Sequence, residues 1–177
     1  AIARGVMEHF RPNAPLPPEP PVGLRVINDG RGGLQLAWEP SARATGYTVE
    51  DSPDGKGFAA AGTAAGTSWS TARLEPGAVR WFRVRAFNAS GRSFPTEVLG
   101  GRRAPGGKAG VLLVNGFDRL GRHVKSWENT RDYARLHGAA LAAVASRGIA
   151  FDSCGNEALE LGRIGLGGYR VVDWVLG

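Results

Sequence analysis

The sequence has little of what covalent and metal chemistry needs. It contains one cysteine, Cys154, so no intrachain disulfide can form, and three histidines, at positions 9, 123 and 137, that stand far apart. Zinc sites need three or four converging ligands, and no HExxH or CxxC spacing occurs. The sequence therefore predicts no metal site and no cofactor within its 177 residues.

Lysine and long apolar runs are also scarce. Only three of the 22 basic residues are lysines, and the arginines are scattered along the chain. The net charge of +6 and the pI of about 10.2 therefore indicate a basic surface with a weak attraction to anionic polymers, but no specific nucleic-acid partner. No apolar run approaches the roughly 18 residues of a membrane span, so none is expected.

The N-terminal residues predict a helix followed by a linker. In residues 1–11, Ile2, Val6 and Phe10 recur at a four-residue spacing that places them on one helical face. Residues 12–20 are rich in proline and should be extended and semi-rigid. Because the sequence starts inside a helical pattern and stops inside an apolar strand pattern, we expect a fragment of a longer protein, with the helix ending an upstream domain.

Residues 21–103 carry the all-β pattern of short alternating runs separated by turn residues. Alternate apolar residues of the run LQLAW, at 34–38, share one face. The run WFRVRAF, at 81–87, has one apolar face that should point to the core. The length fits a sandwich domain of about 100 residues. The outward residues of the last run are Trp81, Arg83 and Arg85.

This outward stripe is a candidate interaction surface, because aromatic and arginine side chains can stack on sugars or dock a partner. The alternative is that a neighbouring domain, or packing at the strand edge, covers the stripe.

The same segment resembles a fibronectin type III domain. The resemblance rests on PPVGLRV, LQLAW, GYTVEDSPDG and LEPGAVRWFRVRAFNASGRSFPTE, in that order, and it identifies Trp38 as the core tryptophan. One residue departs from the pattern. The family usually has a tyrosine three residues after the glycine of the corner Leu74-x-Pro76-Gly77, bonded back to the corner, and here Arg80 stands in its place. Either Trp81 compensates by packing over the corner, or the corner is looser.

After a glycine-rich linker at 104–109, the pattern of residues 110–177 changes to α/β. The apolar run at 111–114 is typical of a strand buried on both faces. A long helix follows, capped by Ser126 or Asn129 and stopped at Gly148. A short strand at 149–151, a helix at 156–161 and a strand at 171–176 complete a Rossmann-like pattern with a parallel sheet. The apolar helical face consists of Tyr133, Leu136, Ala140, Leu141 and Val144.

The loop after the first of these strands lies at the carboxyl end of the sheet, where open α/β sheets hold ligands. The candidate ligand-binding residues there are Asn115, Asp118, Arg119 and Glu157. The alternative for Asp118 and Arg119 is a local ion pair. Cys154 lacks the G-x-[CS]-x-G elbow of a nucleophile, so we expect a partly buried small residue in a loop that begins a helix.

Residues 110–177 are similar to a segment that follows fibronectin type III modules in secreted bacterial proteins, where it begins an α/β domain distantly like class I glutamine amidotransferases. Residues 1–10, AIARGVMEHF, resemble the terminal helix of zinc-dependent N-acetylmuramoyl-L-alanine amidases. The resemblance implies a secreted or periplasmic parent that cuts peptidoglycan between glycan and stem peptide, with its zinc ligands upstream of Ala1. This chain would be a monomeric, non-catalytic accessory segment whose partner is peptidoglycan or another cell-envelope glycan or protein.

Two other functions stay open. One is an extracellular enzyme whose active site lies in the completed α/β domain, and the other is an adhesion or carbohydrate-binding protein.

Overall fold

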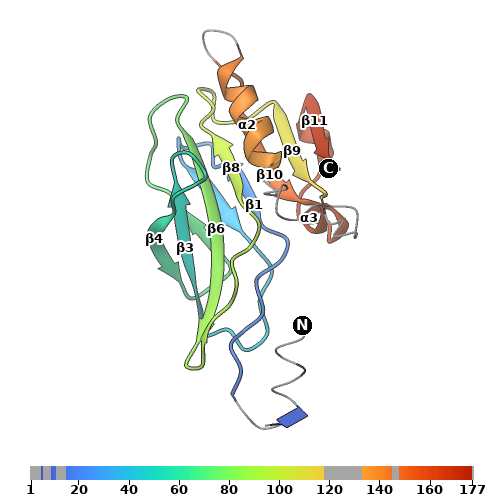
Figure 1. Cartoon of the computed structure of the whole chain (residues 1–177). Coiled ribbons are helices and arrows are strands. Elements are labelled where there is room, and N and C mark those ends of the chain that lie inside the picture. Colours follow the sequence, from blue (N-terminus) through green and yellow to red (C-terminus); the bar gives the residue numbers. More distant parts are fainter. Residues whose placement is uncertain (1–4, 6–8, 11–14, 118–132, 145–147, 177) are drawn as a thin grey trace.

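A computed structural model describes residues 5, 9–10, 15–117, 133–144 and 148–176, and the account below concerns these residues (Figure 1). The described elements follow in chain order. They are β1 (Arg25–Asn28), β2 (Leu34–Ala37), β3 (Gly46–Ser52), β4 (Ala59–Ala64), β5 (Ser68–Ser70), β6 (Val79–Asn88), β7 (Gly91–Arg92), β8 (Leu99–Arg102), β9 (Val111–Asn115), α2 (Tyr133–Ala143), β10 (Phe151–Gly155), α3 (Asn156–Glu160), a short 3-10 helix (Leu166–Gly168) and β11 (Val171–Val175). No helix among them is long and apolar enough to cross a membrane.

The first eight strands form a two-layered antiparallel sandwich. Strands β1, β2 and β5 make one layer, while β4, β3 and β6 make the other, with β7 and β8 both pairing with β6. The predicted inward residues of 34–38 and 81–87 are all buried, because alternate side chains of a strand share one face. Trp38 fills the centre, with its ring in edge contact with that of Tyr47 at 5.3 Å between centroids. The predicted sandwich core is therefore confirmed.

One of the two sheets continues beyond the sandwich. Strand β10 pairs antiparallel with β1, placing Cys154 opposite Arg25, and β9 and β11 then add in parallel, so the six-stranded order is β11-β9-β10-β1-β2-β5. Figure 1 shows the yellow-to-red strands standing beside the sandwich at the end away from the N-terminus. The sheet is mixed rather than parallel throughout. The boundaries at 21–103 and 110–177 stay a prediction, but backbone hydrogen bonds cross them.

Helices cover both faces of the added strands. On one face, α2 contacts β8, β9 and β10, and Leu113, Ala134 and Val175 belong to the same apolar cluster as the sandwich core. On the other face, α3 closes a separate cluster built around Leu112 and Cys154. The run at 111–114 is thus buried on both faces, as predicted.

The predicted apolar face of the long helix is wrong in part. In α2 the buried residues are Ala134 and Gly138, whereas Leu136 and Val144 are half exposed. The reason is close packing: a Cβ at Gly138 would lie 2.5 Å from the indole of Trp81, so only the smallest side chains fit against the sheet. The other three residues of the predicted apolar face also differ in burial. Tyr133 and Leu141 pack partly against the core, and Ala140 is exposed.

The predicted short strand at 149–151 is also corrected. Strand β10 starts at Phe151 and runs through Gly155, because it is hydrogen-bonded to β1 on one side and β9 on the other. Cys154 therefore lies inside a strand and not in a loop. Gly148 and Gly162 have positive φ angles of 58° and 65°, as expected of residues that follow a helix. The predicted caps Ser126 and Asn129, and the helical residues Ile2 and Val6, lie outside the described residues.

Candidate functional site

Three polar side chains converge at the carboxyl ends of β9 and β10. Asn115 ends β9 opposite Gly155, which ends β10, and Glu157 lies in the first turn of α3. Glu97 reaches in from the segment before β8, where its Oε2 accepts a hydrogen bond from Asn115 Nδ2. A Cβ built on Gly155 would contact carboxylate oxygens of both Glu97 and Glu157, so glycine is what leaves room for the two side chains.

The structure thus brings Asn115 and Glu157 together, while Asp118 and Arg119 lie outside the described residues. Sequence reasoning missed Glu97, which comes 18 residues before Asn115 in the chain. No local motif marks it, since it approaches the site only because β8 packs against β10. Within the described part of the chain, no group of three His, Cys, Asp or Glu side chains could hold a metal ion.

Cys154 lies directly beneath this group and is fully buried. Burial is the main cause that raises the pKa of its thiol to about 12, and the negative charge of Glu97 is the second. The thiol therefore stays protonated at neutral pH, and a protonated thiol is a poor nucleophile.

We expect Cys154 to be unreactive while the protein is folded. Modification by 5,5′-dithiobis(2-nitrobenzoate) at pH 8 should be more than about a hundred-fold slower in buffer than in urea, because the thiolate is the attacking species. Similar rates in the two solvents would show that this thiol is accessible in the native state.

The prediction that Trp81 faces the surface is wrong, because this residue lies where the sandwich meets the added strands. Only 2% of its surface is exposed, because Phe151 lies against its ring at 5.9 Å between centroids and α2 covers it at Gly138. The alternative stated above, that an adjacent segment covers the stripe, holds at this position. Trp81 joins the sandwich to the added strands instead of facing a partner.

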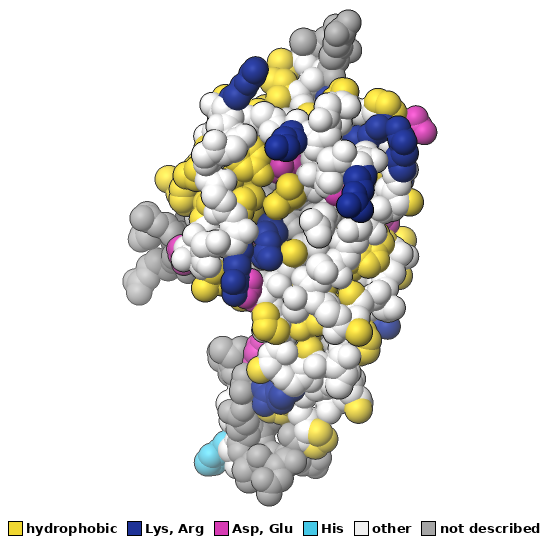
Figure 2. Space-filling view, turned by 180° about the vertical axis from the view of Figure 1, so that it is seen from behind, with side chains coloured by type: hydrophobic (Ala, Val, Ile, Leu, Met, Phe, Trp, Pro, Cys, Tyr) yellow, Lys and Arg dark blue, Asp and Glu magenta, His cyan; other side chains and the backbone are white. Residues whose placement is uncertain are grey.

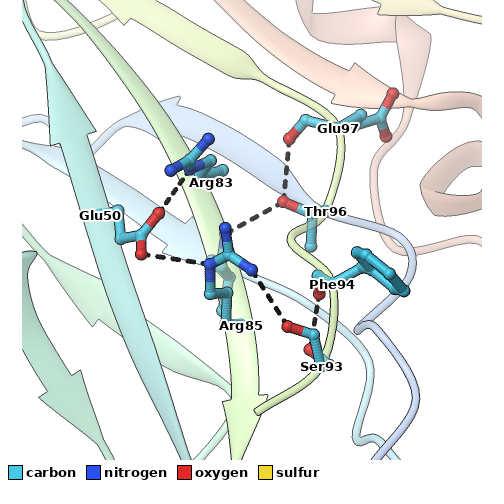
Figure 3. Close-up of polar contacts among 8 residues, drawn as sticks. Glu50, Arg83, Arg85, Ser93, Phe94, Thr96 and Glu97 are labelled. Carbon is cyan, nitrogen blue, oxygen red and sulfur yellow. Dashed lines mark hydrogen bonds and ion pairs between the residues drawn. The ribbon is translucent and has the colours of Figure 1, made fainter. Parts of the chain in front are cut away.

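The two arginines of the stripe remain partly exposed but are held in place. Arg83 and Arg85 each bond one carboxylate oxygen of Glu50, in the second case at 3.2 Å (Figure 3). The Arg83 guanidinium also lies 4.3 Å from the ring centroid of Phe58, and Arg85 Nη1 donates to the Ser93 carbonyl at 3.1 Å. About a quarter of each arginine side chain is accessible, which leaves some of its donors for a ligand.

Neither alternative for the corner at 74–77 describes it fully. The buried Arg103 donates from Nη1 to the Leu74 carbonyl at 2.7 Å, and its backbone N–H bonds Ala78. Arg103, which directly follows β8, therefore makes a link to the corner in place of the tyrosine that the resemblance implies, while Trp81 packs elsewhere.

A buried carboxylate ties the added strands to the sandwich. Asp152 Oδ1 accepts from the backbone N–H and from Nδ2 of Asn28, at 2.8 and 2.7 Å, and its Oδ2 accepts from the Tyr169 hydroxyl at 2.9 Å. Asn28 in turn accepts from the N–H of Ala104 at 2.7 Å. Burial raises the pKa of Asp152, against the opposing effect of these hydrogen bonds.

Basic side chains do not gather on the face that Figure 2 shows. Among the residues coloured there, the lysines and arginines stand in several places, some beside carboxylates. Arg163 is an ion-paired arginine that bonds both carboxylate oxygens of Glu39, at 2.8 and 2.9 Å. The lysines and arginines coloured on this face therefore form no continuous basic patch there.

The antiparallel layers β1-β2-β5 and β4-β3-β6 define an immunoglobulin-like sandwich of the fibronectin type III kind. No protein-family model matches this chain, and no curated protein matches it.

Several solved structures similar to the chain are fibronectin type III domains. A fibronectin type III-like protein from Clostridium thermocellum is 21% identical, covering 50% of this chain and 92% of its own, with a TM-score of 0.43. The sixth such domain of human fibronectin type III domain containing protein 3 is 19% identical, over 53% and 92%, with a TM-score of 0.46. Titin domains are 30% identical, over 46% of this chain and 30% of theirs, with a TM-score of 0.42.

Proposed function

We propose that this chain is a non-catalytic spacer and interaction segment of a secreted or periplasmic cell-wall hydrolase of the N-acetylmuramoyl-L-alanine amidase type. Its partner is peptidoglycan or another cell-envelope glycan or protein. Residues 110–177 are the N-terminal half of a Rossmann-like α/β domain in this proposal, and the parent's zinc belongs to residues upstream of Ala1.

The observation that carries the spacer role is the continuous sheet. Fibronectin type III domains commonly serve as spacers or interaction modules, and here the sandwich extends without a break through the β1–β10 pair. The shared apolar cluster and the Asp152–Asn28 hydrogen bonds fasten the same junction. Such a unit can hold its neighbours at a set distance, which a flexible tether cannot do.

Two features support a non-catalytic role. Cys154 is buried and protonated, so it does not resemble an activated nucleophile. Among the described residues, the histidine with a carboxylate partner is His137, whose Nδ1 lies 2.8 Å from Asp173 Oδ2. This pair lies on one face of the sheet, whereas Cys154 belongs to the cluster that α3 covers on the other face. The alternative of an active site in the completed α/β domain keeps one supporting feature, the polar group at the strand ends.

Binding to the cell wall tests the proposal. We expect the chain to sediment with insoluble peptidoglycan and to release no soluble fragments from it when zinc is added. Arg83→Gln and Arg85→Gln together should weaken sedimentation at least about three-fold, because these donors face the surface beside Glu50, and direct contacts of this kind are worth about 0.5–1.5 kcal/mol.

The matched control is Arg163→Gln, an exposed and ion-paired arginine on α3's side of the molecule. It should sediment like the parent chain. Absence of sedimentation would contradict the cell-wall partner, and hydrolysis by the chain alone would contradict the non-catalytic role.

A further inference from the structure

The proline-rich segment is fastened to the sandwich rather than free. Three backbone carbonyls of residues 16–22 accept hydrogen bonds from residues at one end of the sandwich. Leu16 accepts from Asn88 Nδ2 at 3.0 Å, Glu19 accepts from Ser41 Oγ at 2.5 Å, and Val22 accepts from the N–H of Glu39 at 2.9 Å. Glu39 and Ser41 belong to the β2–β3 connection and Asn88 is the last residue of β6, so the segment bridges that loop and the end of β6.

The three acceptors are spaced by three residues, which is the period of a polyproline II helix. The sequence from Leu16 to Val22 reads L-PP-E-PP-V, so each acceptor is a non-proline residue and each pair of prolines fills the gap. Burial follows the same period, since Pro18 and Pro21 are buried while Pro17 and Glu19 are exposed. One edge of such a polyproline II helix would face the sandwich once per turn.

The surface that receives this edge is complementary to it. Asn88 donates from the same Nδ2 to the carbonyl of Arg43, which joins the end of β6 to the β2–β3 loop beneath the segment. Arg43 itself holds a φ of 67°, unusual for a residue other than glycine, and so turns its carbonyl toward Asn88. Pro17 lies over Gly91, where a built Cβ would stand 3.5 Å from the proline ring.

We propose that this end of the sandwich is a binding surface for a polyproline II helix, and that its occupant is the chain's own segment from Leu16 to Val22. The segment acts as a strap that fixes the direction in which the chain enters the sandwich. Polyproline II helices suit this role, because proline fixes φ in advance and little entropy is lost on docking. The inference builds on the proposed spacer function by making the spacer directional at its N-terminal end.

Backbone ¹⁵N relaxation of the whole chain tests the strap without any cell-wall ligand, so its outcome is separate from that of the sedimentation assay. The amides of Leu16 and Glu19 should have order parameters of about 0.85, like those of the strands. In the double variant Ser41→Ala/Asn88→Ala, which removes two of the donors, they should fall below about 0.6.

The strap can also be loosened from its own side. Pro18→Gly should lower the same two order parameters, because glycine removes a buried ring and the fixed φ. Pro15→Gly is the matched control, since Pro15 is exposed and precedes the bonded register, and it should leave them unchanged. Order parameters below about 0.6 in the parent chain, or unaltered in Pro18→Gly, would overturn the proposal. If the double variant does not fold, Pro18→Gly carries the test alone.

Discussion

Trp81→Ala should lower the free energy of unfolding by about 3–5 kcal/mol, the usual loss for a buried tryptophan. The indole is 2% exposed and fills the space between β6, Phe151 and the glycine face of α2. The glycines at 100 and 138, which contact the indole, have no side chain that could fill the cavity left behind. Urea denaturation followed by far-ultraviolet circular dichroism measures the change.

Trp174→Ala is the matched control, because this tryptophan also lies on a strand, β11 of the six-stranded sheet, but is 46% exposed. It should lower the free energy of unfolding by less than half as much. The sandwich and the added strands should also unfold in one transition, since one apolar cluster contains residues of both. A loss below about 1 kcal/mol for Trp81→Ala would contradict the junction role, since truncations at buried aromatic sites exceed that.

Alternation alone was enough to predict the sandwich. In the run at 81–87 every second residue is buried in the core, because strand periodicity depends only on local backbone geometry. The same periodicity could not tell that the other face of β6 is covered at Trp81 and open at Arg83. That difference depends on where α2 lies, which is set by packing between residues more than 50 positions apart.

In the candidate site too, the local features could be predicted from the sequence and the long-range contact could not. A strand that ends at Asn115 and a helix that begins beside Gly155 could be predicted from apolar runs and glycine positions. Glu97 could not, because the β7–β8 segment lies beside the strand ends only in a fold where β10 pairs with β1. The sandwich and the α/β residues were expected to be joined by a linker, and no local pattern in Arg25–Asn28 or Phe151–Gly155 indicates that these strands pair with one another.

Asp152→Ala should lower the free energy of unfolding by on the order of 2–5 kcal/mol, because the backbone N–H of Asn28 and one of its two Nδ2 hydrogens lose their buried acceptor. Asp173→Ala is the matched control: its carboxylate is about one-third exposed on β11 and bonds only His137 among the described residues, so water can replace it. A similar loss for the two variants would contradict the importance of the buried carboxylate.

Asp152→Asn separates hydrogen bonding from charge, since its amide oxygen can still accept from Asn28. Burial raises the pKa of Asp152 in the folded state above its ordinary value of 3.8, which we take for the unfolded state. At a pH between the folded-state and unfolded-state pKa values, the folded state therefore keeps a proton that the unfolded state has released. The free energy of unfolding of the parent chain should therefore fall as pH rises through this window, by at most about 1.4 kcal/mol per pH unit for one group, and then level off. In Asp152→Asn this contribution is absent, so the variant should gain stability relative to the parent as pH rises from about 4, measured by urea denaturation at each pH. The opposite trend would mean that the hydrogen bonds from Asn28 and Tyr169 outweigh burial, and that the charged carboxylate itself stabilises the junction.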